Sequence, residues 1–306
     1  MSSSFIQPDP SMIGRISKAP FALTPDPGKL FKERVARLEI LAKDAHLGPY
    51  LTFLAGIARI QGELASSLSA LEPVPVDQVE RARENAMPPI DRAAIVQSQD
   101  CRRTLLRFLE AVGALEMPPT ASQALAQLRE ADEETMDWMI DNVLADDLPV
   151  ESLAHHLFVA AAIQVHAARL AATLDANGLV PVRVGVCPAC GGKPVASIVV
   201  GVQGVEGARY GCCSCCSTMW NEVRIKCLAC GSTKGVGYRA VETGTDEATV
   251  KAEVCDSCHS WVKILYQNKN PSLEAVADDV ASLGLDLLMK DTEYKRAGFN
   301  PFLVGY

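Results

Sequence analysis

No stretch of this 306-residue sequence is apolar for long enough to cross a membrane. The longest uninterrupted apolar run, Leu157–Ile163, has seven residues, whereas a helical span needs about 20. The segment Met1–Gly14 has neither a basic leader nor an apolar core, so we expect no export signal. We therefore predict a cytoplasmic protein without membrane insertion.

An excess of positive charge is also missing. The formal net charge is −8 and the sequence pI is about 5.2, which disfavours a uniformly basic nucleic-acid binder. The spacing of residues supports no Ser-His-Asp arrangement, no phosphate-binding glycine loop and no pair of catalytic carboxylates. We therefore expect no catalytic residues and no enzyme. With 48% hydrophobic and 22% charged residues, the composition is that of an ordinary globular protein.

Strand signals are absent from residues 1–181, which we predict to form a helical domain. Helical spacing of apolar residues follows an Asp26-Pro27 start and continues through Tyr50 to Leu71. Further helices are expected over about 91–115 and over about 151–175, the second of them followed by Gly178 as the glycine after its end. Two more are expected to start at Thr120, with a capping box to Gln123, and at Asp132. Residues 1–25 are predicted to be an extended arm, and the proline-rich residues 73–89 a connecting loop.

Short β-rich runs replace the helical pattern after Pro181. They are Val195–Val200, Met219–Ile225, Val236–Ala240, Thr249–Val254 and Trp261–Tyr266. We divide this region into two small metal modules, residues 182–222 and 223–268, followed by a C-terminal helix and tail over 269–306. The predicted fold class is therefore multidomain, with a helical bundle followed by two tandem small β modules and a C-terminal helix.

Cysteine is concentrated in one part of the chain. Ten of the eleven cysteines lie between Cys187 and Cys258, and the eleventh is Cys101. Eight of them form four pairs with two-residue spacing, and such pairs in a reducing compartment are typical of metal ligands rather than disulfides. The pairs are Cys187 and Cys190, Cys213 and Cys216, Cys227 and Cys230, and Cys255 and Cys258.

The distances between the pairs along the chain suggest how they combine. The intervening segments have 22, 10 and 24 residues, and only the two long ones can form a hairpin that returns to complete a tetrahedral site. We therefore assign the first and second pairs to one metal site, and the third and fourth to another. An interleaved combination, first pair with third and second with fourth, stays open. Four thiolates suit zinc and iron equally, so the spacing does not identify the metal.

The remaining candidates have simpler interpretations. Cys212 and Cys215 are neighbours of the second pair, and we interpret both as spare thiols. Cys101 falls on an apolar helical stripe and is expected to be buried. His166 is interpreted as a core histidine with satisfied hydrogen bonds, and His259 as no ligand because the cysteine set beside it is complete.

Several motifs in this region resemble the FdhE family, the accessory proteins of formate dehydrogenase. They are C-P-A-C-G-G-K-P-V from Cys187, R-Y-x-x-C-x-x-C-S-T-x-W from Arg209, R-I-K-C-L-A-C-G from Arg224, A-E-V-C-D-S-C from Ala252, D-D-V-A-S-L-G-L-D from Asp278, and Asn300-Pro301. The resemblance covers residues 180–303 by motif and the helical half by architecture only. Cys212, Cys215 and Met219 depart from the family pattern without removing a candidate ligand.

The resemblance implies two rubredoxin-like modules that hold iron, with zinc possible in the same sites. It also implies a maturation factor that binds the catalytic subunit of respiratory formate dehydrogenase in the cytoplasm before export. Two alternatives stay open, a rubredoxin-like electron carrier and a zinc-ribbon nucleic-acid binder. Residues 183–270 carry ten Lys and Arg against seven Asp and Glu, and thiolates with two divalent ions lower that balance to about −1. We therefore expect no nucleic-acid partner. The sequence does not specify the oligomeric state.

Overall fold

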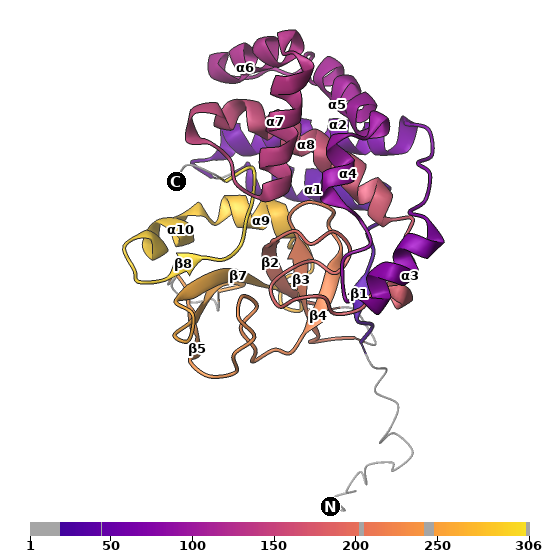
Figure 1. Ribbon diagram of the computed structural model, residues 1–306. Coiled ribbons are helices and arrows are strands. Elements are labelled where there is room, and N and C mark those ends of the chain that lie inside the picture. Colours follow the sequence, from indigo (N-terminus) through magenta and orange to yellow (C-terminus); the bar gives the residue numbers. More distant parts are fainter. Residues whose placement is uncertain (1–18, 44, 202–204, 242–247, 304–306) are drawn as a thin grey trace, which may run out of the picture.

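The chain folds into a helical layer that lies over one mixed β-sheet (Figure 1). The structure is a computed structural model that describes residues 19–43, 45–201, 205–241 and 248–303. Helix α9 lies between the two layers, where it contacts α1 and strand β2. The main hydrophobic core runs without interruption from the helices into the sheet, because it includes Phe158, Leu228 and Val262 together.

Ten α-helices occur among the described residues. They are α1 (Pro27–Leu41), α2 (Gly48–Ser67), α3 (Val76–Glu84), α4 (Arg92–Val96), α5 (Gln99–Val112), α6 (Pro119–Glu130), α7 (Glu133–Ala145), α8 (Leu153–Ala171), α9 (Ala275–Ala281) and α10 (Leu283–Lys290). Helix α8 lies at the centre of the helical layer and contacts α2, α5, α6 and α7. Most of its residues are buried, as expected for a helix that neighbours surround.

Two predicted helix starts are confirmed by their caps. The Asp26 side chain accepts hydrogen bonds from the Gly28 and Lys29 amides, and Pro27 occupies the first turn of α1. The Asp132 side chain accepts from the Thr135 amide at the start of α7. Both carboxylates satisfy amides that a helix terminus leaves without partners.

Other helical predictions are wrong in detail. The predicted loop over 73–89 contains α3, and the helix predicted over 91–115 is divided where Ser98 caps α5. The capping box from Thr120 does not form, because α6 begins after Pro118 without a side-chain cap. Helix α8 ends at Ala171, and Gly178 belongs to a separate 3-10 turn. The C-terminal helix is two short helices that meet at Ser282.

The sheet contains eight strands among the described residues. They are β1 (Ala22–Leu23), β2 (Pro194–Val199), β3 (Arg209–Cys213), β4 (Met219–Glu222), β5 (Val236–Arg239), β6 (Val250–Cys255), β7 (Ser260–Tyr266) and β8 (Lys295–Arg296). The five predicted strand runs correspond to β2, β4, β5, β6 and β7, whereas β1, β3 and β8 were not predicted. Strand β3 is short, and its sequence is Arg-Tyr-Gly-Cys-Cys, which lacks the β-branched residues that indicate a strand. The predicted N-terminal arm lies outside the described residues except for 19–25, which include β1.

The strand order shows how the two cysteine-rich halves combine. The order is β1-β4-β3-β2-β7-β6-β5, with β8 paired to β7. Strands β2, β3 and β4 pair antiparallel, as do β5, β6 and β7. The parallel pairing of Ser197 with Ile264 and of Val199 with Tyr266 connects the two units. The two predicted modules therefore share one continuous sheet.

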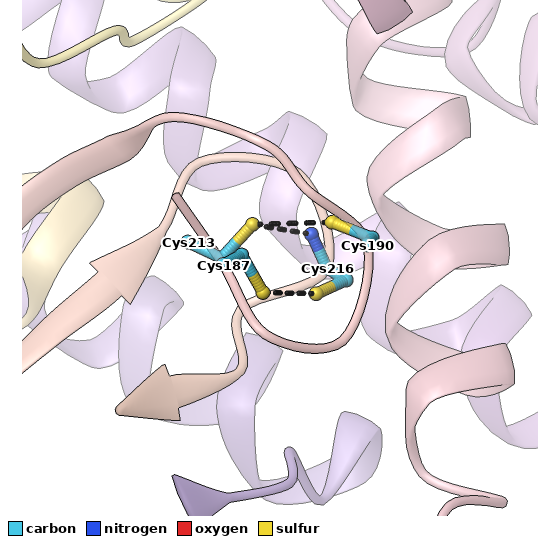
Figure 2. A group of neighbouring side chains, drawn as sticks. All are labelled: Cys187, Cys190, Cys213 and Cys216. Atoms are coloured by element: carbon cyan, nitrogen blue, oxygen red, sulfur yellow. Dashed lines mark hydrogen bonds between the residues drawn. The ribbon is translucent and has the colours of Figure 1, made fainter. Parts of the chain in front are cut away.

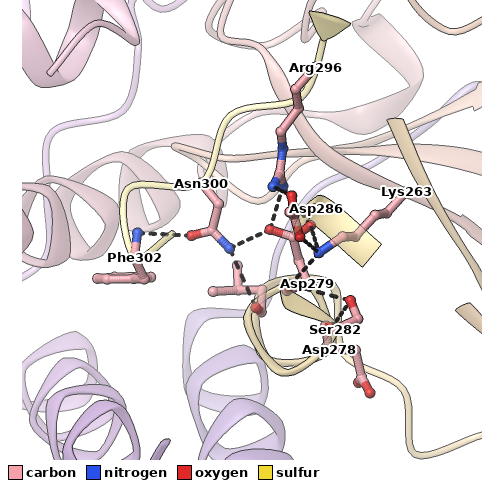
Figure 3. Close-up of polar contacts among 9 residues, drawn as sticks. Lys263, Asp278, Asp279, Ser282, Asp286, Arg296, Asn300 and Phe302 are labelled. Carbon is pink, nitrogen blue, oxygen red and sulfur yellow. Dashed lines mark hydrogen bonds and ion pairs between the residues drawn. The ribbon is translucent and has the colours of Figure 1, made fainter. Parts of the chain in front are cut away.

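A buried ionic cluster attaches the C-terminal helices to the sheet (Figure 3). The Lys263 ammonium on β7 lies 3.3 Å from the Asp279 carboxylate and 2.5 Å from that of Asp286. Arg296 binds the same two carboxylates, and the Asn300 amide donates to Asp279 at 2.8 Å. Because the Lys263 and Asp279 side chains are inaccessible to solvent, each charge depends on the others for compensation.

None of the described helices is by itself long and apolar enough to cross a membrane. A pair of segments, Glu133–Ala145 with Val150–Ala171, reaches the required length and composition only in combination, across a bend of 117°.

Candidate metal centres

The first cysteine group consists of Cys187, Cys190, Cys213 and Cys216 (Figure 2). The first two lie in the turn before β2, and the last two lie at the end of β3 and in the turn that follows it. The Cys187 and Cys216 sulfurs are 3.6 Å apart, and those of Cys190 and Cys213 are 3.5 Å apart. All four side chains are buried.

The second cysteine group has the same arrangement and lies later in the chain. It consists of Cys227 and Cys230 before β5, with Cys255 at the end of β6 and Cys258 in the following turn. Two sulfur pairs, Cys227 with Cys258 and Cys230 with Cys255, are each separated by 3.8 Å. The sulfurs group as the predicted pairing requires, and the interleaved combination does not occur. That these cysteines bind metal stays a prediction.

Matching backbone turns present the leading pair of each group. The Cys187 amide donates to the Gly192 carbonyl, and the Gly191 amide donates to the Cys187 carbonyl. The same two bonds occur from Cys227 to Ser232 and from Gly231 to Cys227. Gly191 has a φ of 73° and Gly231 a φ of 78°, a conformation that favours glycine.

Both groups have the dimensions of a tetrahedral thiolate site. A metal–sulfur bond of about 2.3 Å places the four sulfurs of a tetrahedron about 3.8 Å apart, which matches the 3.5–3.8 Å observed. A disulfide would need about 2.05 Å. Backbone amides also donate to the sulfurs, from Ala189 to Cys187 and from Ser232 to Cys230. Each group could therefore hold one metal ion, and the geometry does not distinguish iron from zinc.

Burial disfavours the thiolate form of most cysteines in the first cysteine group. Burial raises the pKa of the Cys213 thiol well above its usual range, and it does the same for Cys216. Hydrogen bonds from the Cys187 and Cys213 thiols lower the pKa of Cys190. Four adjacent buried thiolates would therefore form only together with a cation that compensates their charge.

A cationic side chain approaches the first cysteine group from the helical layer. Arg92 donates to the Asp146 carboxylate at 3.1 Å, and Asp146 also accepts from the Lys193 amide. Burial lowers the pKa of Arg92, but the nearby Cys215 thiol and the Asp146 carboxylate raise it above its ordinary value overall. Arg92 therefore stays charged beside the sulfurs. No local pattern predicts this contact, since Arg92 and Asp146 are distant in the chain.

The other sulfur atoms lie outside both groups. Cys212 on β3 is buried, and burial raises its pKa. Cys215 is also buried, and its amide donates to the Cys213 sulfur. Neither thiol belongs to a group that could hold a metal ion among the described residues. Cys101 is buried in the helical core as predicted, and burial raises its pKa to about 12.

The histidines also lie outside the two cysteine groups. His259 faces the Glu293 carboxylate at 3.2 Å. His166 is 3% exposed, and its Nδ1 has no hydrogen-bond partner in the described part of the chain. His166 is thus a core residue as predicted, but the prediction that its hydrogen bonds are satisfied is wrong for this atom.

Known protein families match this chain along nearly all of its described residues. Three family models match in succession: FdhE, N-terminal, over residues 19–184; FdhE, central domain, over 186–224; and FdhE, C-terminal domain, over 225–303. A protein named FdhE homolog from Rhizobium meliloti is 71% identical over 306 residues and covers 100% of both chains.

More distant relatives have the same family name. Protein FdhE of Salmonella choleraesuis is 34% identical over 286 residues, which are 93% of this chain and 91% of that protein. The crystal structure of the FdhE protein from Pseudomonas aeruginosa superimposes with a TM-score of 0.80 at 32% identity, and covers 93% of this chain and 99% of that one. The resemblance inferred from the cysteine motifs is thereby confirmed, and the chain belongs to the FdhE family.

Proposed function

We propose that this protein is an accessory factor for the maturation of respiratory formate dehydrogenase, and that it binds the catalytic subunit of that enzyme in the cytoplasm before export. Membership of the FdhE family over the whole described chain is the observation that carries this proposal. Its role is binding rather than catalysis, so the two cysteine groups serve as metal sites and not as nucleophiles.

Iron is the metal that we propose for both cysteine groups, with zinc able to replace it. Iron held by four thiolates would supply one-electron redox chemistry and a visible thiolate charge-transfer colour. The protein supplies the sulfur positions, the amide donors to them and the burial that limits access of water. These features suit either metal, so the choice of iron depends on the family resemblance.

A deletion strain tests the proposed role. Removal of the gene should abolish formate-dependent dye reduction by membranes, and the native chain should restore it. Variants Cys190→Ser and Cys230→Ser test the two cysteine groups separately, with Cys101→Ala as a control at a cysteine remote from both. Full dye reduction in the deletion strain would contradict the proposal.

Electron transfer is a second candidate, and the exposure of Cys230 favours it. A protein that only carried electrons would need a reversible one-electron potential at the second cysteine group. Voltammetry of the iron-loaded protein measures that potential directly. A metal that does not change its oxidation state within the range of reduction potentials of cytoplasmic electron carriers would exclude this role.

A further inference from the structure

The two cysteine groups differ in their exposure to solvent. All four sulfur-bearing side chains of the first cysteine group are buried. In the second, Cys227 and Cys255 are buried, Cys258 is half-buried and Cys230 is exposed. The first site is therefore enclosed by the protein, whereas the second is open on the side of Cys230.

Exposed apolar side chains lie on the segments next to the second cysteine group. Val184 is 40% exposed, Val223 60%, Ile225 64% and Tyr238 46%. Val184 lies against Gly231, the residue after Cys230, and the Tyr238 hydroxyl donates to the carbonyl of Arg224, between Val223 and Ile225. These two contacts bring Val184 and Tyr238 against the segment 224–231, which carries Cys227 and Cys230.

The same region is basic in an otherwise acidic protein. Residues 223–240 contain four Lys and Arg and no Asp or Glu, whereas the whole chain has a net charge of −8. Lys226 pairs with Glu222 at 3.2 Å. Arg183, Arg224 and Lys234 are exposed and have no acidic partner in the part of the chain that the structure describes. The nearby Asp256 carboxylate accepts a hydrogen bond from the Tyr294 hydroxyl.

This region is also held in place before any partner arrives. The buried Arg209 guanidinium donates to the Lys226 carbonyl at 2.8 Å and pairs with Glu253 at 2.9 Å. The Ser257 hydroxyl donates to the Lys234 carbonyl at 3.0 Å. A surface fixed in this way loses little conformational entropy when it binds.

We propose that the Cys230 face, formed by Val184, Val223, Ile225 and Tyr238 with Arg183, Arg224 and Lys234, is a docking surface for an acidic, partly apolar protein surface, which covers the second cysteine group when it binds. If the basic residues served only to compensate the negative charge of the thiolates, the exposed aliphatic side chains would have no explanation. An apolar centre with a charged rim is the usual composition of a protein interface.

A nucleic acid fits this surface less well. Three of its four apolar side chains are aliphatic, whereas binding of single strands depends on aromatic side chains on which bases stack. We therefore assign the surface to a protein, and a nucleic-acid probe serves as the competing outcome.

The experiment uses the catalytic subunit of formate dehydrogenase as the probe. The choice of this partner rests on the proposed function. Binding of the purified subunit to the metal-loaded chain is measured for the native protein and for the double variant Arg224→Glu with Ile225→Asp. The matched control is Leu106→Asp with Arg107→Glu on α5, because Leu106 and Ile225 are both 64% exposed. Two metal ions per chain in every variant show that it is folded.

We expect the Arg224 and Ile225 variant to weaken binding at least about tenfold, as loss of central interface residues does, and the control to bind as the native chain. Bound subunit should also slow the removal of metal from the second cysteine group by a chelator. Equal binding by the native chain and the Arg224 and Ile225 variant would overturn the docking surface and leave the proposed function intact.

Two other outcomes also count against the docking surface. No binding of the subunit by the native chain would overturn the proposed function together with this partner. Binding of a single-stranded oligonucleotide that the Arg224 and Ile225 variant loses would assign the surface to nucleic acid instead.

Discussion

The guanidinium of Arg209 lies 2.9 Å from the carboxylate of Glu253, and both side chains are excluded from solvent, with exposures of 0% and 1%. Arg209 belongs to β3 beside the first cysteine group, and Glu253 belongs to β6 beside the second. This ion pair connects the two cysteine-containing units across the sheet. Because each charge is buried, each needs the other to remain stable.

Replacement of Arg209 by Met should destabilise the folded protein by about 3–5 kcal/mol, since it leaves a buried carboxylate without its cation. Guanidinium-induced unfolding followed by circular dichroism measures this change. Arg103→Met is the control, because Arg103 and Asp100 form an exposed pair with side-chain exposures of 55% and 39%, whose loss should cost less than about 1 kcal/mol. Similar unfolding midpoints for the two variants would contradict a structural role for the buried pair.

The spacing of the cysteines favoured the observed grouping of the sulfurs over the interleaved one, because a two-residue gap and a long returning hairpin are local properties of the chain. The ion pairs around them were not predictable in this way. Arg92 meets Asp146, and Arg209 meets Glu253, only after helices and strands have packed. No periodicity or motif marks these arginines among the others.

We predict that protein prepared without oxygen contains iron, with about two ions per chain, and is coloured. Thiolate-to-iron charge transfer produces absorption in the visible range, which zinc does not, because its d shell is filled. A visible spectrum together with metal analysis checks this. A colourless anaerobic preparation with two zinc ions and no iron would exclude the iron assignment.

Replacement of Cys190 by Ser should remove the first metal ion and spare the second, and Cys230→Ser should do the reverse. The physical reason is that each sulfur contacts only its own group, with Cys190 3.5 Å from Cys213 and Cys230 3.8 Å from Cys255. Metal analysis of each variant is the measurement, and Cys215→Ser serves as a control that should keep both ions. Half-occupancy of both sites in either variant would favour shared ligands instead.

The two metal ions should also leave at different rates. A coloured chelator must reach a ligand sulfur to compete, and Cys230 is exposed whereas the first cysteine group is buried throughout. We expect release in two phases of equal amplitude, with the fast phase from the second cysteine group. The Cys230→Ser variant should lack the fast phase and keep the slow one. A single phase in the native protein would mean that exposure does not control release.

Helix boundaries were harder to predict than the helices themselves. Apolar spacing continues from 91 to 115, but the Ser98 side chain accepts from the Cys101 amide and starts a new helix there. Pro73 and Pro75 indicate a loop, yet α3 begins directly after Pro75. The start of α5 depends on the Ser98 cap, whereas α3 begins without a side-chain cap, so neither boundary could be read from the periodic pattern.

His166 should make the protein less stable in mild acid. Burial lowers its pKa to about 4 from 6.5, an effect that Arg169 reinforces and Asp100 opposes. Between these two values the unfolded chain takes up a proton that the folded chain does not, so stability falls as the pH decreases from 6.5 towards 4. The full effect of this group is about 3 kcal/mol. His156 acts in the same direction, because burial lowers its pKa as well.

The variant His166→Gln isolates this contribution, because glutamine does not titrate. Its free energy of unfolding should depend less steeply on pH than that of the native protein between pH 6.5 and 4, whatever its stability at neutral pH. Denaturant titrations at several pH values measure the two slopes. Equal slopes for His166→Gln and the native protein would mean that His166 takes up its proton over the same pH range in the folded and unfolded states, contrary to this prediction.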